Sequence, residues 1–447
     1  MNGSNTLPRI SRRTILRFFF LCGGSAITAP FLGGCSTDPV TGEKSLVMMT
    51  RSQEIALDRK QAPFQFSADY GILMDRELNK YLNRVGMELA RRSHRPDMPF
   101  SFRGVNAAHI NAYAFPGGSI AATRGILVEL QSEAELAALL GHEIGHVCAR
   151  HAAEQMGKGL LVNLLVAGAS IATSSAGHEG TAELISRLGG LGAGALLARY
   201  SRNDEREADA LGMEYMTRAG YTPLGMAGLM EILLRSGEHN PTAIELMFAT
   251  HPMSRERLET ARLQAHERYA SMLDNPDHRQ RYMDHTAGLR RLKPAIRAIQ
   301  KAETALARKQ IRQAEELLHT ALRHAPDDYQ ALVVMAKCQF MHHNHDEALS
   351  YARQATQVYP KEAQGHWLLA MSSLAKEKYD QALRELSEVD RLLPGNPDIL
   401  FYRGRALEAM QRRDEAARAY AAFLEKVRQG DKAKYAYTRL REWGYIR

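Results

Sequence analysis

The sequence predicts a mostly α-helical protein in which a domain with a small β-sheet precedes an α-solenoid. Apolar residues recur at helical spacing through much of residues 51–285, and one strand-like island with Asn, Gly and Pro lies near residues 105–128. After Pro294 the sequence repeats every 34 residues. A chain of 447 residues, 45% of them hydrophobic, is long enough to bury more than one core.

The charge balance does not favour nucleic acid as a partner. The net charge is +8, and four arginines near the N-terminus supply half of it: Arg9, Arg12, Arg13 and Arg17. No basic stripe interleaved with aromatic residues follows. Four cysteines are also too few for a disulfide scaffold, so neither class of protein is expected.

The N-terminus has the order of an export signal. Basic residues at 9–17 precede an apolar stretch at 18–32, which is too short to span a bilayer comfortably. Residues 11–17 also resemble the twin-arginine signal, so two export routes stay open. Leu32-Gly33-Gly34-Cys35 resembles a lipobox; the alternative is a cysteine that merely ends the apolar stretch. We expect a signal peptide at 1–34, lipid attachment at Cys35 and a polar tether at 35–50.

This N-terminus implies the place of the protein in the cell. An exported chain acylated at Cys35 would lie on the periplasmic side of the cell envelope, with the lipid anchor as its contact with the membrane. Ser36 follows the cysteine where an acidic residue would retain such lipoproteins in the inner membrane. By that resemblance the outer membrane is favoured.

A pair of histidines marks the first candidate site. Ser132 to Glu135 form a capping box, and the apolar periodicity after them predicts a buried helix over about 133–156. His142 and His146 stand four residues apart on this helix, so both imidazoles share a face and can bind one Zn²⁺. Glu143 lies at the edge of that face, where a general base could reach a water molecule. Two satisfied core histidines are the alternative.

A second helix offers the missing ligand. The segment 203–220 places Glu205 and Asp209 one turn apart, so one carboxylate can complete a three-ligand site while the other orients an imidazole. Glu207 points about 200° away from Glu205 and is expected to be solvated. His151 would lie about 140° around the first helix from His146, which predicts a structural role.

The repeat has the tetratricopeptide period. Small residues and prolines recur at intervals of 34: Ala314, Ala348, Ala382 and Ala416; Ala336, Ala370 and Gly404; Pro326, Pro360 and Pro394. Small side chains let paired helices approach, and each proline ends a unit. We predict about four repeats and a closing helix within residues 286–447. Their concave surface would bind a protein or peptide; a rigid spacer is the alternative.

The segment that carries His142 and His146 and the segment that carries Glu205 and Asp209 together resemble the gluzincin metallopeptidases related to the CAAX prenyl endopeptidase. Three further blocks are similar to that family, at residues 38–42, 111–118 and 250–252. With the export signal and the repeats, the chain most resembles the family's periplasmic and lipoprotein members. The resemblance implies a gluzincin-type zinc metalloprotease domain over 51–285, with one Zn²⁺ held by His142, His146 and Glu205, Glu143 as base and Asp209 supporting a ligand.

The same resemblance implies a function. We expect a zinc-dependent endopeptidase that hydrolyses misfolded or misassembled envelope proteins, in quality control and outer-membrane protein assembly. Protein or peptide substrates would enter the zinc site, and the repeats would bind the envelope's assembly machinery. The alternative is a non-proteolytic chaperone or scaffold whose metal site is capped or structural.

Four further features have more than one interpretation. The segment Asn111, Ala112, Tyr113 and Ala114 is either a substrate-pairing edge strand or an ordinary one. His251 either occupies zinc's fourth position as a latch or packs a loop. Arg257 either stabilises an oxyanion or forms a surface salt bridge. Residues 157–173 and 184–198 are expected to be core helices, with a lid or an interfacial helical pair as alternatives.

Overall fold

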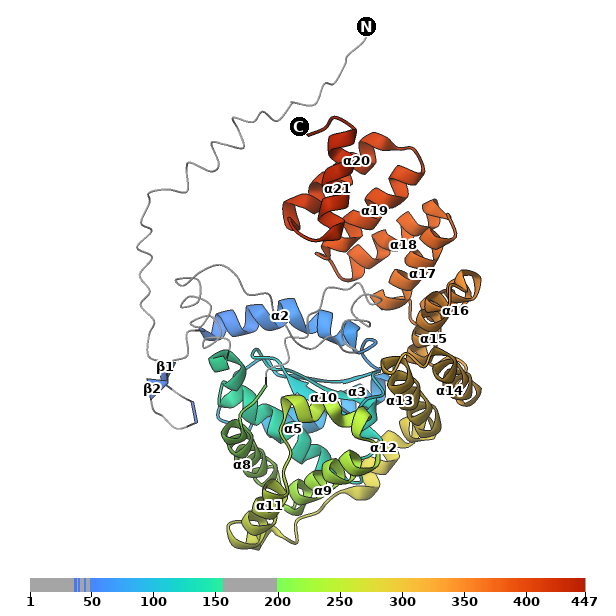
Figure 1. The fold of residues 1–447 in the computed structure, drawn as a ribbon. Helices are drawn as coiled ribbons and strands as arrows, with labels where there is room; N and C mark the ends of the chain where they lie inside the picture. Colours follow the sequence, from blue (N-terminus) through green and yellow to red (C-terminus); the bar gives the residue numbers. More distant parts are fainter. Residues whose placement is uncertain (1–35, 38, 41–43, 46–48, 156–198, 447) are drawn as a thin grey trace, which may run out of the picture.

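The computed structural model describes residues 36–37, 39–40, 44–45, 49–155 and 199–446 (Figure 1). The predicted signal peptide, Cys35 and the apolar segments 157–173 and 184–198 lie outside the described residues. Among the helices that the structure describes, none is both long enough and apolar enough to cross a membrane.

The predicted fold class is confirmed: helices dominate, one small sheet lies in the first part of the chain, and helical repeats follow. The helices of the first part are α2 (Arg51–Ala68), α3 (Arg76–Ala90), α4 (Arg124–Leu127), α5 (Glu133–Cys148), α8 (Arg202–Arg218), α9 (Leu224–His239), α10 (Pro241–Thr250), α11 (Arg255–Glu267) and α12 (Arg279–Arg291), with a 3-10 turn, η1, at Ala270–Met272. Side-chain caps define several of their starts, including Ser132 at α5 and Ser201 at α8.

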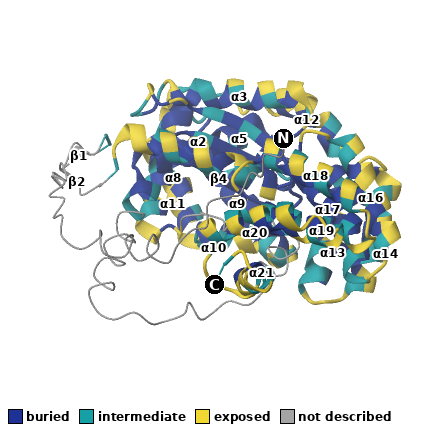
Figure 2. Cartoon of the chain, turned by 90° about the horizontal axis from the view of Figure 1, so that it is seen from above, coloured by how far each residue is buried: buried dark blue, intermediate teal, exposed yellow. Residues whose placement is uncertain are grey.

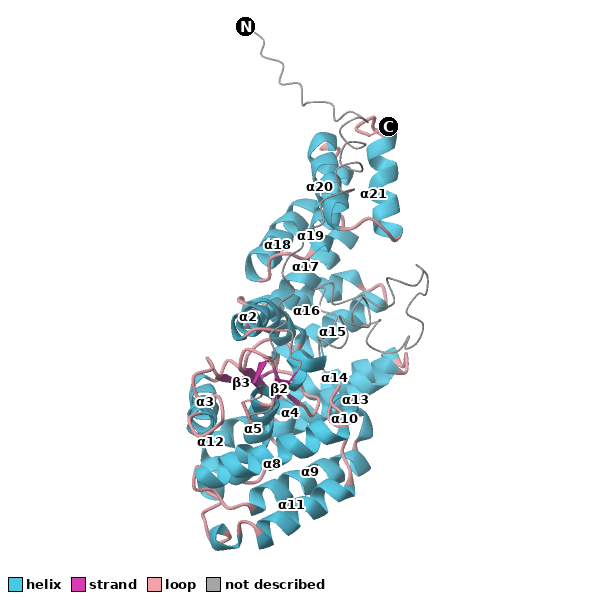
Figure 3. Ribbon diagram, turned by 90° about the vertical axis from the view of Figure 1, so that its left-hand side faces the viewer, coloured by secondary structure: helices cyan, strands magenta, loops and turns pink. Residues whose placement is uncertain are grey.

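The sheet has three strands in the order β3-β5-β4, so β4 lies at an edge. β3 (Ser101–Val105) pairs in parallel with β5 (Ser119–Thr123), and β4 (Ala112–Ala114) pairs antiparallel with β5. The sheet lies between α2 and α5 (Figure 3). A separate two-stranded ladder joins β1 (Ser36–Thr37) to β2 (Lys44–Ser45).

Residues 126–128, predicted to contribute to the sheet, do not. Ile126 and Leu127 belong to the short helix α4, because the Thr123 hydroxyl caps its start and accepts a hydrogen bond from the Ile126 N–H at 3.3 Å. An apolar run this short does not distinguish a buried strand from a buried helical turn.

The helix predicted over 133–156 is also shorter than expected. Nearly every residue of α5 is buried, as the dark blue ribbon in Figure 2 shows, but the helix ends at Cys148. Arg150 then adopts a left-handed backbone conformation, with φ of 61°. A further helical turn begins at His151.

The second part of the chain stacks four helical hairpins and a closing helix, as the repeat predicts. The helices are α13 (Lys293–Ala307), α14 (Ile311–His324), α15 (Tyr329–Met341), α16 (His345–Val358), α17 (Ala363–Ala375), α18 (Tyr379–Leu392), α19 (Pro397–Ala409), α20 (Arg413–Lys426) and α21 (Asp431–Glu442). The four repeated alanines of the second helices are fully buried: Ala314, Ala348, Ala382 and Ala416. A side chain larger than alanine would separate these paired helices.

α2 lies between the two parts of the molecule (Figure 1). Near its N-terminal end, Glu54 bonds to Arg95 and Arg150 of the first part. Near its C-terminal end, Phe64 packs against the repeats, and the Ser67 hydroxyl bonds to Glu362. The helix therefore contacts both the sheet domain and the solenoid.

Candidate metal centre

Glycines at the crossing of α5 and α8 bring the candidate ligands together. A Cβ atom on Gly212 would lie 2.7 Å from the backbone nitrogen of His142, and one on Gly145 would lie 2.9 Å from the carbonyl oxygen of Ala208. Neither position leaves room for a side chain. Glycine at both points lets the helices carrying the histidines and Glu205 approach closely.

Four buried side chains converge between these helices: His142, His146, Glu205 and His251. One ligand atom from each lies within 4.8 Å of all the others. The Nε2 atoms of His142 and His146 are 3.0 Å apart, and His146 Nε2 lies 3.3 Å from Glu205 Oε1. His251 Nδ1 lies 3.0 Å from the same Glu205 oxygen and 3.4 Å from His142 Nε2.

This arrangement fits zinc. Ligand atoms about 2.1 Å from a tetrahedral ion are about 3.4 Å from one another, close to the separations in the cluster. The donors are imidazole nitrogens and a carboxylate oxygen, the set that Zn²⁺ prefers. Burial lowers the pKa of His146 well below its ordinary value, which favours the neutral form that a metal requires.

Glu143 is fully buried, and none of the described residues donates a hydrogen bond to either of its carboxylate oxygens. Its nearest charged neighbour is His251, whose Nε2 lies 3.9 Å from Oε1. Burial raises the pKa of Glu143, against the charges of His251 and His142. A buried carboxylate without donors is costly to stability, so its retention points to a role in chemistry.

Asp209 and Arg257 form an ion pair behind the cluster, in which Arg257 is buried and the Asp209 side chain is 15% exposed. Asp209 Oδ1 lies 2.8 Å from His142 Nδ1, which leaves Nε2 of that ring facing the cluster. Arg257 donates to both Asp209 oxygens, at 2.7 and 2.8 Å, and its Nη1 lies 2.6 Å from Glu205 Oε2. Burial would raise the pKa of Asp209, but the Arg257 charge holds it below its ordinary value. The surface salt bridge considered for Arg257 is wrong, because the guanidinium is only 7% exposed.

Three residues near the histidines have partners that the sequence did not reveal. Tyr200 stacks on the His146 ring, with centroids 3.8 Å apart and planes at 18°. His151 Nδ1 lies 2.9 Å from His146 Nδ1, although a continuous helix would place the two side chains apart. Glu207, expected to be solvated, lies 3.3 Å from His151 Nε2 and has a side chain only 37% exposed.

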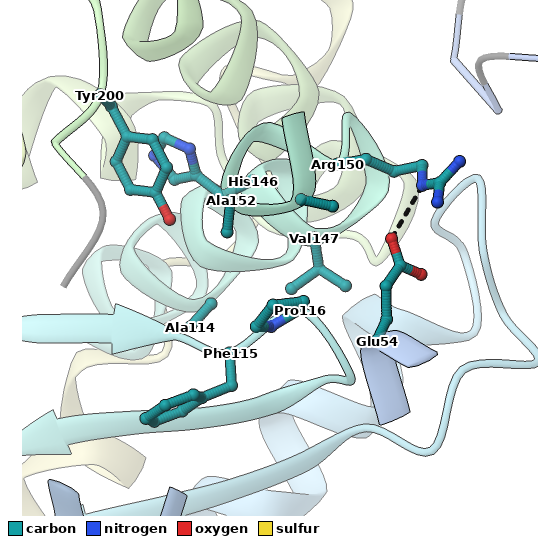
Figure 4. Close-up of a pocket in the computed structure, with 10 residues that line it drawn as sticks. Glu54, Ala114, Phe115, Pro116, His146, Val147, Arg150, Ala152 and Tyr200 are labelled. Carbon is teal, nitrogen blue, oxygen red and sulfur yellow. Dashed lines mark hydrogen bonds and ion pairs between the residues drawn. The ribbon is translucent and has the colours of Figure 1, made fainter. Parts of the chain in front are cut away.

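The edge strand ends beside the cluster. Figure 4 shows Ala114 and Pro116 next to the turn of α5 that carries His146, with the Phe115 ring pointing away from this helix and Tyr200 beside His146. The sequence grouped these segments only through a likeness to a family, since nothing in their local pattern encodes their proximity.

Known proteins are similar to parts of this chain. Residues 76–265 match the model of peptidase family M48, and residues 305–371 and 368–431 match tetratricopeptide repeat models. The β-barrel assembly-enhancing protease of Yersinia pestis is 28% identical over 253 residues, 54% of this chain and 51% of that protein. Its Escherichia coli K12 counterpart is 30% identical, covering 44% of this chain and 40% of the relative. Metalloprotease LoiP of E. coli K12 is 31% identical, and the match covers 37% of this chain and 62% of that protein. The chain spans about half the length of the first of these relatives.

Proposed function

We propose that this chain, whose residues 76–265 form a peptidase family M48 domain ahead of tetratricopeptide repeats, is a zinc-dependent endopeptidase of the bacterial cell envelope. The convergence of His142, His146 and Glu205 beside Glu143, a buried carboxylate that accepts no hydrogen bond from the described residues, carries the proposal. The relatives named as proteases support it.

The proposed chemistry divides between the metal and Glu143. Zinc held by His142, His146 and Glu205 would polarise the carbonyl group of a peptide bond. Glu143 accepts a proton from the attacking water and delivers it to the departing amine. Its raised pKa suits the first step, because a carboxylate with a higher pKa accepts a proton from water more readily. The products are two peptides with a new carboxylate and a new amine.

Substrate would pair with β4. In the β4–β5 ladder Thr123 N–H donates to Asn111 O at 3.0 Å, and Phe115 N–H donates to Ser119 O at 2.8 Å. Antiparallel pairing alternates, so Ala112 and Ala114 turn their N–H and C=O groups away from β5, toward the open edge. The buried side-chain amide of Asn111 has no hydrogen-bond partner among the described residues. An extended peptide could satisfy these groups.

The repeats would supply partner binding. The face formed by α15, α17 and α19 has a hollow of about 350 Å³, lined mainly by apolar and aromatic side chains such as Trp367, Met371 and Tyr402. Such a surface suits a peptide or protein segment. We propose that it recruits misassembled envelope proteins or the machinery that assembles them. We further propose that acylated Cys35 anchors the enzyme on the periplasmic side, with the outer membrane favoured.

The first prediction tests Glu143. We expect Glu143→Gln to keep its bound zinc and lose casein cleavage by at least 100-fold. The side-chain amide occupies the same space as the carboxylate but cannot accept a proton from water. Zinc content and initial cleavage rates are measured on the purified mature chain. Glu135→Gln, on the same helix but away from the cluster, is the matched control and should cleave normally. Retained cleavage by Glu143→Gln would reject Glu143 as the base.

A non-proteolytic scaffold is the second candidate, and one observation favours it. His251 completes a four-ligand cluster, and four protein ligands are typical of structural zinc sites. Zinc-loaded chain without activity on casein or on a β-barrel precursor, in both wild type and a variant lacking His251, would favour the scaffold.

A further inference from the structure

His142 and His146 are supported in different ways at their second ring nitrogens. His142 Nδ1 faces a carboxylate, with Asp209 Oδ1 at 2.8 Å. His146 Nδ1 instead faces another imidazole, with His151 Nδ1 at 2.9 Å, and His151 Nε2 lies 3.3 Å from Glu207 Oε2. A chain of hydrogen-bonding groups therefore runs from the cluster through two histidines to a carboxylate at the surface.

The end of α5 brings His151 to this place. Arg150 has a φ of 61°, a left-handed backbone conformation that non-glycine residues seldom adopt. After this turn, His151 lies beside His146, with their Nδ1 atoms 2.9 Å apart. Without it His151 would lie about 140° around the helix from His146.

Buried ion pairs hold this turn. Arg150 Nε donates to Glu54 Oε1 at 2.8 Å, on the side of α5 away from Tyr200 (Figure 4). Arg95 donates to the other Glu54 oxygen at 2.6 Å and to the carbonyl of Val147 at 2.9 Å. Glu54 belongs to α2 and is fully buried. Its ion pairs with Arg95 and Arg150 therefore hold the end of α5 in place through contacts with another helix.

The contacts determine where the hydrogens lie. If Nε2 of His146 binds a metal, its Nδ1 carries the hydrogen and donates to His151 Nδ1. His151 then carries its hydrogen on Nε2 and donates to Glu207. Both nitrogens of each ring then have a partner, and Tyr200, stacked on His146, restrains rotation of that ring. Groups of this kind orient a ligand and raise its donor strength.

We propose that His151 and Glu207 are positioning residues for His146: the relay fixes its ring and strengthens its hold on the metal. This inference rests on the proposed zinc site. Removing such a partner lowers metal affinity by about 10- to 100-fold in comparable sites.

The test uses the full mature chain in a Glu143→Gln background, so that cleavage plays no part in the readout. Zinc affinity is measured by chelator competition, and the visible spectrum of the Co²⁺ form reports the ligand field. We expect His151→Phe, which keeps the ring shape but has no acceptor, to weaken zinc binding by about 10- to 100-fold and to shift the Co²⁺ bands. His151→Asn restores an acceptor near the Nδ1 position and should bind zinc within about threefold of the parent.

Two further variants complete the design. His366→Phe removes a histidine that is paired with Glu385 in the repeats, at 2.7 Å, and should leave zinc affinity and spectrum unchanged. Glu207→Gln, at a partly exposed site, should weaken binding roughly threefold and shift the Co²⁺ bands. If His151→Phe does not fold, Glu207→Gln tests the proposal in its place.

The outcomes separate the two proposals. Parent-like affinity and spectrum in His151→Phe, or in Glu207→Gln if the phenylalanine variant is unfolded, would overturn the relay. Equal loss in folded His151→Asn and His151→Phe would also overturn it, because a hydrogen-bond acceptor would then make no difference. Failure of the parent itself to bind zinc would instead reject the proposed metal site.

Discussion

Arg257 uses its guanidinium to hold two carboxylates in place. Its Nε and Nη2 atoms bind Asp209, and Nη1 donates to the Pro252 carbonyl at 3.0 Å and contacts Glu205. Three of the five N–H donors thus form hydrogen bonds, and Nη1 also forms an ion pair with Glu205. Most of the guanidinium is therefore engaged by these two carboxylates and the Pro252 carbonyl. We therefore expect it to act first as the support of Glu205 and Asp209.

His251 provides the second prediction, also at the scale of one residue. Its Nδ1 lies 3.0 Å from Glu205 Oε1, so a bound metal would have this imidazole as a fourth ligand in place of substrate or water. We expect His251→Ala to cleave casein about 3- to 10-fold faster while zinc affinity falls, because one ligand is lost and one position opens. Initial rates at saturating zinc are the measurement.

The control for this latch is a loop variant that keeps the imidazole. Met253→Ala changes a partly buried residue of the same loop and should leave the rate near that of wild type. An unchanged or slower rate in His251→Ala would favour the loop-packing interpretation of this histidine.

At the scale of elements, the sequence predicted regular structure better than its interruptions. The 34-residue spacing predicted the paired helices, because each buried alanine repeats a packing requirement. The turn at Arg150 had no such signal: an arginine replaces the usual glycine, and Glu54, its partner, lies 96 residues away. The contact of His151 with His146 depends on that turn, so local periodicity did not predict it, nor the contact between His151 and Glu207. Donor residue types were predictable, but their long-range partners were not.

The edge strand β4 provides the third prediction. Ala114→Pro removes one N–H from the open edge of β4, while the hydrogen bonds of Asn111 and Phe115 to β5 do not involve that group. The loss of one substrate hydrogen bond, at about 0.5–1.5 kcal/mol, predicts a fall in kcat/KM of roughly 2- to 13-fold. Peptide cleavage kinetics measure the effect, and zinc content should not change.

Ala114→Val is the matched control for this strand. Valine retains the backbone N–H and favours extended conformation, so any effect of side-chain size near the cluster is seen without loss of the donor. Equal rates in the proline variant and the valine variant would show that substrate does not pair with this edge.

At the scale of the whole molecule, the solenoid is joined to the sheet domain by buried polar contacts. Arg124, the first residue of α4, binds both oxygens of Asp328 at 2.5 and 3.0 Å and the amide oxygen of Gln330 at 3.0 Å. The Tyr70 hydroxyl donates to Glu303 Oε1 at 2.9 Å. Since α4 directly follows β5, the repeats are attached next to the sheet whose edge borders the metal centre.

This attachment predicts a large cost for one substitution. Arg124 is 3% exposed and Asp328 is 5% exposed, so Arg124→Ala would leave a carboxylate buried without its cation. We expect the free energy of unfolding to fall by about 3–5 kcal/mol. Both tryptophans of the chain, Trp367 and Trp443, lie in the repeats, so their fluorescence during urea denaturation reports that part. Arg391→Ala removes an exposed pair with Glu388 and should cost no more than about 1 kcal/mol. Equal urea midpoints for the two variants would mean that the Arg124 contact does not stabilise the attachment of the repeats.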